Sequence, residues 1–457
     1  MVDKVRAVCY IVGGTFQAAK LLRKTIVKNS RSPLIFIFLT IFIDLLGVGI
    51  VLPLLPFYVK MIETNSPAWM AANYALVVGA LTASYSLFQF LFAPILGGLS
   101  DRFGRRPVLL LSLTGAGFSY VLFGLADRFE PLGATAVLAV LFVSRIAAGI
   151  TGGSISTAQA YIADITTPET RARGMGLIGA AFGLGFMLGP AIGGLLSTIS
   201  LSAPAFASAT LIFASVIFGY FTLPESLPVE RRTEKMGSLN PLRRLSAVVQ
   251  RESIRPLLMG ILLLNLAFAG LQSNFAVFTE SRFGFGPMQI AFLFAFIGLM
   301  AVIMQGFLIR KLVPMFGEAR LAVTGLALMT VAFLGIAFVP VAWMLYPTLA
   351  LLSIGSGMAT PSLTSLISRS VSAQEQGSVL GGTQAMNSLT MIVGPLMAGF
   401  LFDTVGPLAP YLTGSVLIGS AAIVLTLVLR PQLVGVPAPQ KAPAPLRVEA
   451  EMSGSGD

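Results

Sequence analysis

The sequence contains no histidine and a single cysteine, Cys9. One thiol cannot form an internal disulfide or a thiolate metal cluster, and it leaves the redox compartment open. Histidine is the side chain that most often carries protons near neutral pH, and it is the commonest metal ligand. Without it, carboxylates are left to carry any buried proton, and we expect neither a metal nor another cofactor.

Charge is also scarce. Only 11% of the residues are charged, 55% are hydrophobic, and the mean hydropathy is +0.86. Soluble chains carry about a quarter charged residues, so a water-soluble fold is excluded. The apolar residues form runs of roughly twenty, the length of a helix that crosses a bilayer, whereas a β-barrel needs no such runs. We therefore expect an all-α membrane protein.

Twelve such runs are present, divided by a polar stretch into two sets of six. The expected spans are 34–57, 74–99, 108–126, 134–163, 174–196, 204–223, 256–278, 288–309, 321–339, 343–367, 378–402 and 408–429. The predicted parts of the chain are a basic N-terminal segment (1–33), an N-terminal six-helix bundle (34–223), a linker (224–255), a C-terminal six-helix bundle (256–430) and a disordered tail (431–457).

The basic residues predict the orientation. Only Lys60, Arg128 and Arg282 lie in loops opposite the N-terminus and Arg145 lies within a span, which leaves 26 of the 30 Lys and Arg residues on the N-terminal side. Because basic loops stay in the cytoplasm, the linker and both termini are predicted to be cytoplasmic. The net charge of +11 is spread over short loops, so we expect a lipid bilayer rather than nucleic acid as the partner.

The first 33 residues combine basic and apolar positions. Glycines and a glutamine interrupt their apolar stretch, so an interfacial basic helix on anionic lipid is favoured over a cleaved signal peptide. A disordered tail is the other alternative.

The two halves of the chain look like a duplication. Gly189-Pro190 in the fifth span and Gly394-Pro395 in the eleventh lie 205 residues apart, and small residues follow both. Transporters built from such repeats place a solute site at the midplane between two bundles.

The loop after the second span, residues 97–107, reads GGLSDRFGRRP. Its glycines allow a tight turn against a neighbouring helix, while Asp101 can face the positive end of a helix and pair with Arg105. An ordinary basic loop is the alternative, but the ordered Gly, Asp, Gly, Arg, Arg and Pro argue against it. We refer to residues 97–107 as the signature loop.

This loop resembles the signature of the major facilitator superfamily. Three more segments resemble motifs of its drug/proton antiporter branch: DLLGVGIVLP from Asp44, SRIAAG around Arg145, and the Gly-Pro segment of the fifth span. The first half most resembles tetracycline efflux pumps, including Gln89 twelve residues before Asp101. Ser119 replaces a third-span aspartate of those pumps, and their histidine has no counterpart, so tetracycline itself is not predicted as the solute.

The resemblance implies two pseudo-symmetric six-helix bundles, and a monomer in the bacterial cytoplasmic membrane. It also implies that Asp164, at the end of the fourth span, is the partner of the signature loop. Asp101, Arg105 and Asp164 would then form a charge cluster that holds one conformation shut and breaks when the bundles rock. The alternative for Asp164 is a solvated carboxylate at a helix end.

Asp44 and Arg145 are the charged residues predicted deep in the membrane, where each costs roughly 3 kcal/mol if unpaired. We therefore expect them to face each other or a watery cavity. Burial favours the neutral form of Asp44 while Arg145 favours the ionised form, so a change in their separation could exchange a proton for solute. The resemblance implies the same roles. A permanent salt bridge between the two spans is the alternative.

Small residues in the fifth span form a stripe. Gly185, Gly189 and Gly193 are spaced by four, which predicts close contact with another helix. Together with Pro190 and Gly194 they make up the motif that the resemblance links to sealing the central cavity.

Uncharged polar residues on apolar spans are candidates for the solute cavity, with interhelical hydrogen bonds as the alternative. They are Gln89, Asn265, Gln272, Gln384 and Asn387. Asn265 and Gln272 are seven apart and share a helix face.

Enzyme signatures are missing. The GMGLIG at residues 174–179 has the letters of a dinucleotide fingerprint but opens a membrane helix with no strand before it, and no Walker loop is present. We predict a proton-coupled exporter of a small amphipathic or drug-like solute. The alternatives are a facilitator or proton symporter for a metabolite on the same fold and a receptor-like protein without transport.

Overall fold

The computed structural model describes residues 33–63, 66–233, 250–372 and 375–433. The predicted basic helix in the N-terminal segment, most of the linker and the predicted C-terminal tail lie outside the described residues. Within these ranges all long regular elements are helices, and 12 helical segments are long and apolar enough to cross a membrane. The predicted all-α membrane fold is confirmed.

The N-terminal half contains six spanning segments, two of them interrupted. Its elements are α2 (Pro33–Val51), η1 (Leu52–Leu54), α3 (Leu55–Met61), α4 (Ala68–Ala72), α5 (Tyr74–Phe103), α6 (Arg105–Gly124), η3 (Ala126–Leu132), α7 (Ala134–Thr151), α8 (Ser154–Ile165), α9 (Pro168–Ser197) and α10 (Ala203–Thr222).

The C-terminal half contains the other six. Its elements are α12 (Arg255–Phe283), α13 (Pro287–Ile303), a π-helical turn (Met304–Leu308), α14 (Ile309–Phe316), α15 (Glu318–Phe338), α16 (Leu345–Arg369), α17 (Gln376–Thr404), α18 (Ala409–Val428) and α19 (Arg430–Leu433).

The first and fourth spans are each broken within their length. In the first, the 3-10 turn η1 separates α2 from α3 where Pro53 and Pro56 remove backbone donors. In the fourth, Gly152 and Gly153 separate α7 from α8. Such irregular backbone is tolerated at membrane depth only where neighbouring helices or polar groups satisfy it.

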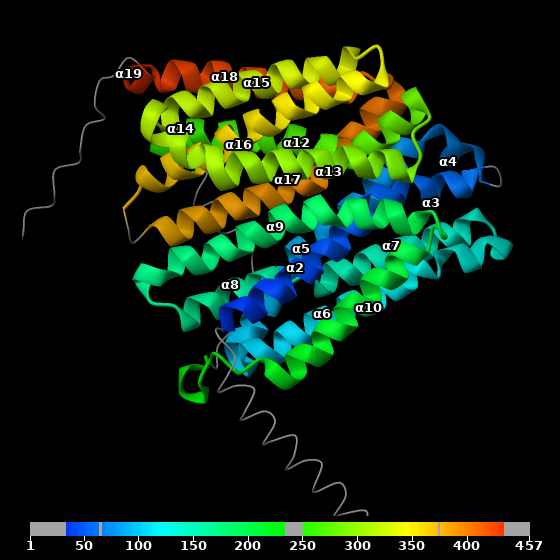
Figure 1. The fold of residues 1–457 in the computed structure, drawn as a ribbon, viewed down its shortest axis with the longest axis horizontal. Coiled ribbons are helices and arrows are strands. Elements are labelled where there is room, and N and C mark those ends of the chain that lie inside the picture. Colours follow the sequence, from blue (N-terminus) through cyan, green and yellow to red (C-terminus); the bar gives the residue numbers. More distant parts are fainter. Residues whose placement is uncertain (1–32, 64–65, 234–249, 373–374, 434–457) are drawn as a thin grey trace, which may run out of the picture.

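The helices form two bundles, one above the other in Figure 1. The N-terminal bundle packs around buried residues such as Ile37, Leu109 and Ile212, and the C-terminal bundle packs around a second core that includes Phe333 and Leu349. The bundles meet where α5 contacts α17 and α9 contacts α13.

The outer surface is apolar. Large hydrophobic side chains are more than half exposed on many helices, among them Phe118, Ile217, Val331, Val416 and Leu427. Soluble proteins rarely expose apolar patches of this extent. The exposure is expected of helices that face lipid tails.

Candidate functional site

Asp44 lies within α2 and is half-buried. The Ser154 hydroxyl, on the first residue of α8, donates a 2.5 Å hydrogen bond to Asp44 Oδ2. The break after α7 thus places a polar side chain of the fourth span against the first-span carboxylate.

Arg145 on α7 is only 6% exposed, and its guanidinium lies over two aromatic rings. Its Cζ is 4.7 Å from the ring centroid of Phe123 and 5.7 Å from that of Tyr120. Its Nε and Nη2 are buried and have no hydrogen-bond partner among the described residues. In the part of the chain that the structure describes, no carboxylate, Asp44 included, lies within 4.0 Å of this guanidinium. The permanent salt bridge that was the alternative interpretation is therefore not formed in this conformation.

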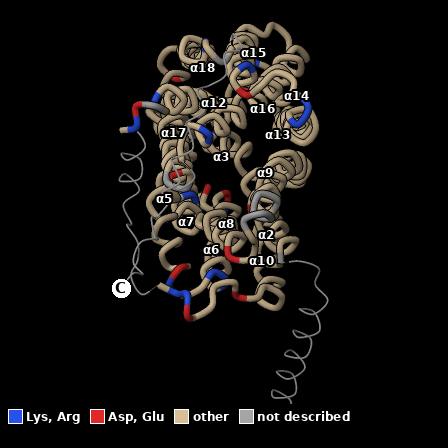
Figure 2. The backbone as a smooth tube through the Cα atoms, turned by 90° about the vertical axis from the view of Figure 1, so that its left-hand side faces the viewer, with Lys and Arg blue, Asp and Glu red and all other residues tan. Residues whose placement is uncertain are grey.

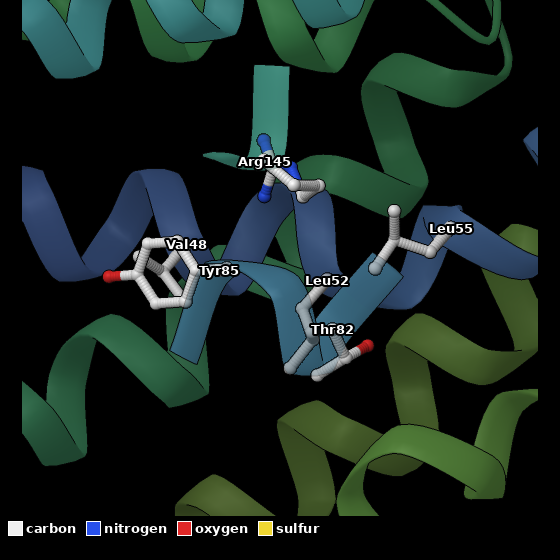
Figure 3. A pocket seen from close by; sticks show the side chains of 6 residues that line it. All are labelled: Val48, Leu52, Leu55, Thr82, Tyr85 and Arg145. Atoms are coloured by element: carbon white, nitrogen blue, oxygen red, sulfur yellow. The ribbon is translucent and has the colours of Figure 1, made fainter. Parts of the chain in front are cut away.

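Arg145 lines a small cavity of about 30 Å³. Figure 3 shows the side chains around it, which are Val48, Leu52, Leu55, Thr82, Tyr85 and Arg145. A cavity needs about 10–15 Å³ of such space to hold one water molecule, so this one has room for water beside the unpartnered guanidinium. Val48 follows Asp44 by one helical turn, so the cavity lies along the helix that carries the carboxylate.

Gln89 on α5 makes one hydrogen bond to the fourth span and one within its own helix. Its Nε2 donates to the carbonyl oxygen of Gly152 at 3.0 Å and to Tyr85 Oη at 3.1 Å. The Gly152 carbonyl lies at the break of the fourth span, where it has no regular helical partner. In this conformation Gln89 supports the broken span, which was the alternative interpretation for the polar candidates.

The other four polar candidates lie in the C-terminal bundle. Asn265, Gln272 and Asn387 are partly buried and Gln384 is exposed. Their side chains make no hydrogen bonds to other described residues, and none has a fully buried unsatisfied atom. They are therefore free for a solute or for water, and their role in a solute cavity stays a prediction.

The glycine stripe of α9 lies against α2. A methyl group at Gly189 would lie 2.8 Å from the Cα of Gly49, and one at Gly193 would lie 2.6 Å from the carbonyl oxygen of Ile50. A methyl at Gly185 would lie 2.9 Å from Leu45 Cβ. Each distance is shorter than real methyl contacts, so glycine is required for this approach of the two helices.

The predicted charge cluster is assembled around Arg105. Its Nη1 lies 2.5 Å from Asp101 Oδ1, and its Nε donates a 3.0 Å hydrogen bond to Asp164 Oδ2. Arg105 also donates to Ser100 Oγ, and the Ser226 hydroxyl donates to Asp164. All five residues belong to the N-terminal bundle and the segment after α10, so the cluster joins elements of one bundle. Its role in holding a conformation shut stays a prediction.

Glu225 is a member of this site that the sequence did not single out. Its Oε1 accepts a 2.8 Å hydrogen bond from the backbone N–H of Arg105, and its Oε2 accepts one of 3.3 Å from that of Arg106. These are orphan donors at the start of α6, where a carboxylate is favoured. In the sequence, Glu225 is a glutamate directly after Pro224 in a polar linker. Nothing there distinguishes it from a solvent-exposed residue.

The two bundles touch at the end where α3 and α4 lie, on the right in Figure 1. There the Asp403 carboxylate at the end of α17 accepts hydrogen bonds from the backbone N–H of Ala75 at 3.1 Å and of Leu76 at 2.7 Å. Lys60 and Glu280 form an ion pair across the same end. Neither contact was predicted, because the sequence does not show which helices face each other.

Glycines on the interface helices are tightly packed at the α3 end and have open space beside them toward the signature loop. At the α3 end a methyl at Gly399 of α17 would lie 2.5 Å from the carbonyl oxygen of Ala75 on α5. Toward the other end of the same interface helices, methyls at Gly97 of α5, Gly179 of α9 and Gly381 of α17 would meet nothing within 4 Å. Figure 2 views the molecule from this second end and shows charged positions beside α6 and α10.

The sequence profile described as Major Facilitator Superfamily matches residues 37–381 and 312–452. Together with the 12 apolar helices, this match defines a multi-pass membrane transporter of small molecules and not an enzyme. The chain belongs to the major facilitator superfamily, as its signature loop predicted.

Several curated relatives are tetracycline resistance proteins. The class C protein of Escherichia coli is 37% identical over 374 residues, which cover 82% of this chain and 90% of that protein. The class B protein of Escherichia coli is 32% identical, with 79% and 86% covered. The human major facilitator superfamily domain-containing protein 10 is also 32% identical, with 83% and 89% covered. The predicted resemblance to tetracycline pumps is confirmed.

Solved structures share the fold. The human organic anion transporter MFSD10 superposes with a TM-score of 0.66 at 28% identity, covering 86% of this chain and all of that one (100%). A mutant of the nucleoside transporter NupG gives a TM-score of 0.67 at 15% identity, covering 87% and 99%. At that identity, the second similarity concerns the fold alone.

Proposed function

We propose that this transporter is a proton-coupled antiporter that exports a small amphipathic or drug-like solute by alternating access. The observation that carries the proposal is the arrangement of its two intramembrane charges. Asp44 accepts a hydrogen bond from Ser154, and Arg145 lines a cavity with two of its donors unused. Ionisable residues within the membrane usually mark ion pathways, and neither of these two forms an ion pair with another described residue.

Protonation of Asp44 would change what this site can bind. An ionised carboxylate only accepts hydrogen bonds, whereas a protonated one also donates. Taking up a proton would therefore weaken the hydrogen bond that Asp44 accepts from Ser154. It would also remove the negative charge that faces a bound solute. Proton and solute would then compete for one site, which is all that antiport requires.

The conformation supports loading from the side of the signature loop. The bundles are joined by Asp403 and by the Lys60–Glu280 pair at the opposite end. With the termini in the cytoplasm, as the distribution of Lys and Arg predicts, this is an inward-facing state. A monomer in the bacterial cytoplasmic membrane completes the proposal.

A second candidate is a carrier of organic anions. It is favoured by the buried Nε and Nη2 of Arg145, because the carboxylate of a solute could accept the hydrogen bonds that these atoms do not make. The similarity to a human protein described as an organic anion transporter supports it. A facilitator or symporter for a metabolite and a receptor without transport are the remaining alternatives.

Transport by the purified protein in liposomes with an imposed pH gradient tests the proposal. Tetracycline, ethidium and fluorescein serve as neutral or zwitterionic, cationic and anionic probes. Antiport predicts that a transported probe moves uphill only with an opposing proton gradient and that Asp44→Asn abolishes this while exchange of probe for probe persists. Probe flux indifferent to the gradient would exclude antiport.

Glu130→Gln is the matched control, because Glu130 is an exposed carboxylate of η3, outside the spanning helices. It should transport as the wild type does. The anion carrier makes a different prediction, since Arg145→Gln should then abolish fluorescein transport while leaving ethidium transport in place. Equal loss of both probes would refute selectivity through Arg145.

A further inference from the structure

A second and much larger hollow lies on the outside of the N-terminal bundle. It is a groove of about 610 Å³ between α6 and α10, at the end where the signature loop lies. Its walls combine two arginines with aromatic and aliphatic side chains, namely Phe103, Arg106, Leu110, Leu111, Tyr220 and Arg232. None of these residues belongs to the Asp44 and Arg145 region.

The groove crosses the depth at which headgroups meet acyl chains. Arg106 lies at the first turn of α6, at the end of the span. Thr114, which also lines the groove, follows it by eight residues along α6 and is thus about 12 Å deeper in the membrane. Leu111 and Tyr220 are each 61% exposed, so the groove opens sideways toward lipid. The groove therefore has its arginines at the end near the membrane surface and apolar side chains at the end deeper in the membrane.

The two arginines keep unused donors. Within the described ranges neither guanidinium has a carboxylate in ion-pair contact, and the Nε atoms of Arg106 and Arg232 are buried without a partner. Arg106 lies over the ring of Tyr220, 5.4 Å from its centroid, and donates to the Tyr220 carbonyl. Glu225 also lines the groove, but its oxygens accept backbone N–H groups. With two arginines and one glutamate, the lining carries a net charge of +1.

We propose that this groove binds one anionic phospholipid from the leaflet next to the signature loop. The phosphate would contact Arg106 and Arg232, and an acyl chain would lie along Leu110 and Leu111. A free phosphate would use only the charged end of the groove, whereas a lipid uses both ends and enters from the side that is open. The site is separate from the Asp44 and Arg145 region, where solute and proton are proposed to bind.

The same site touches the charge cluster. Glu225 lines the groove and also bonds the backbone N–H of Arg105, whose side chain holds Asp101 and Asp164. A bound headgroup would therefore lie one residue away from the centre of that cluster. Lipid binding would stabilise the arrangement of the signature loop.

Native mass spectrometry of the delipidated protein tests the proposal. Phosphatidylglycerol and phosphatidylcholine with the same acyl chains are added in turn. The wild type should bind one phosphatidylglycerol in clear preference to phosphatidylcholine. Arg106→Gln and Arg232→Gln should each weaken this binding about fivefold, since a basic residue near the surface contributes about 1 kcal/mol, and the double variant about 25-fold.

Arg310→Gln is the matched control, because Arg310 is exposed on α14 in the other bundle. It should leave the preference unchanged, and size-exclusion profiles should show that all variants remain folded. The proposal is wrong if the double variant keeps the preference or if Arg310→Gln weakens binding equally. It is also wrong if inorganic phosphate displaces the bound lipid, which would indicate a site for phosphate alone.

Discussion

Replacing Gly189 by alanine probes the contact between α9 and α2. The new methyl carbon would lie 2.8 Å from the Cα and carbonyl carbon of Gly49 and 2.9 Å from the carbonyl oxygen of Leu46. Non-bonded carbons prefer about 3.5–4.0 Å, so the helices must separate by roughly 1 Å. All three neighbours are backbone atoms and cannot rotate away. Overpacking of this kind costs about 1–3 kcal/mol.

Alanine also favours the helix by about 1 kcal/mol relative to glycine, and this gain has to be separated from the clash. Gly179 on the same helix provides the control, because a methyl there meets nothing within 4 Å. Gly179→Ala gains only the helix-propensity contribution. The difference in unfolding free energy between the two variants therefore measures the cost of the clash between α9 and α2. We expect Gly189→Ala to be less stable by about 1–3 kcal/mol.

Equilibrium unfolding in mixed detergent micelles measures this difference. Proton leakage into liposomes is a second readout, since separating α9 from α2 should open a path beside the Asp44 region. Leakage should rise in Gly189→Ala and stay at the wild-type level in Gly179→Ala. Equal stability and equal leakage of the two variants would refute the argument from helix contact.

Three further predictions concern charges at helix ends. Asp403→Asn should speed hydrogen exchange at the first amides of α5 about tenfold, since hydrogen bonds to charged acceptors contribute about 1.5–3 kcal/mol, and unchanged exchange would contradict this. Glu225→Gln should destabilise the start of α6 by about 0.5–1 kcal/mol, visible as faster exchange there and nowhere in the C-terminal bundle. The hydroxyl and backbone N–H of Ser372, together with Arg251, lower the pKa of Glu375 to about 2 from 4.5. The contribution of Glu375 to stability is therefore complete above pH 4.5 and is lost as the pH falls through about 2. A carboxyl NMR titration of Glu375 with a midpoint near 4.5 would disprove this lowered pKa.

The spans could be predicted from the sequence because the membrane leaves few alternatives. Backbone groups in hydrocarbon must bond within their own segment, so an apolar run of about twenty residues has to be a helix. The interruptions are harder to predict, since they hardly change hydropathy. Pro53 and Pro56 are a recognisable local signal for bending of the first span, whereas Gly152 and Gly153 are too weak a signal to divide the fourth.

Among the polar contacts of the candidate site, only those between two side chains were predictable. The pairing of Arg105 with Asp101 could be inferred because the residue types and order of the signature loop are distinctive, whereas Asp164 was predicted through the family resemblance. Glu225 and Asp403 bond backbone N–H groups, which every residue but proline carries, so no residue type marks the partner. The separation of Asp44 from Arg145 depends on how helices tilt, which a linear pattern does not contain.

The break in the fourth span makes α8 a short helix of its own, with a polar contact near each end. Its first residue, Ser154, bonds Asp44 in the membrane interior, and Asp164 near its other end bonds Arg105 at the signature loop. The two contacts are linked by a rigid rod of 12 residues, about 18 Å long. Under the proposed antiport mechanism, a proton taken up by Asp44 would weaken the contact with Ser154, and α8 would carry the resulting movement to the charge cluster at the membrane surface.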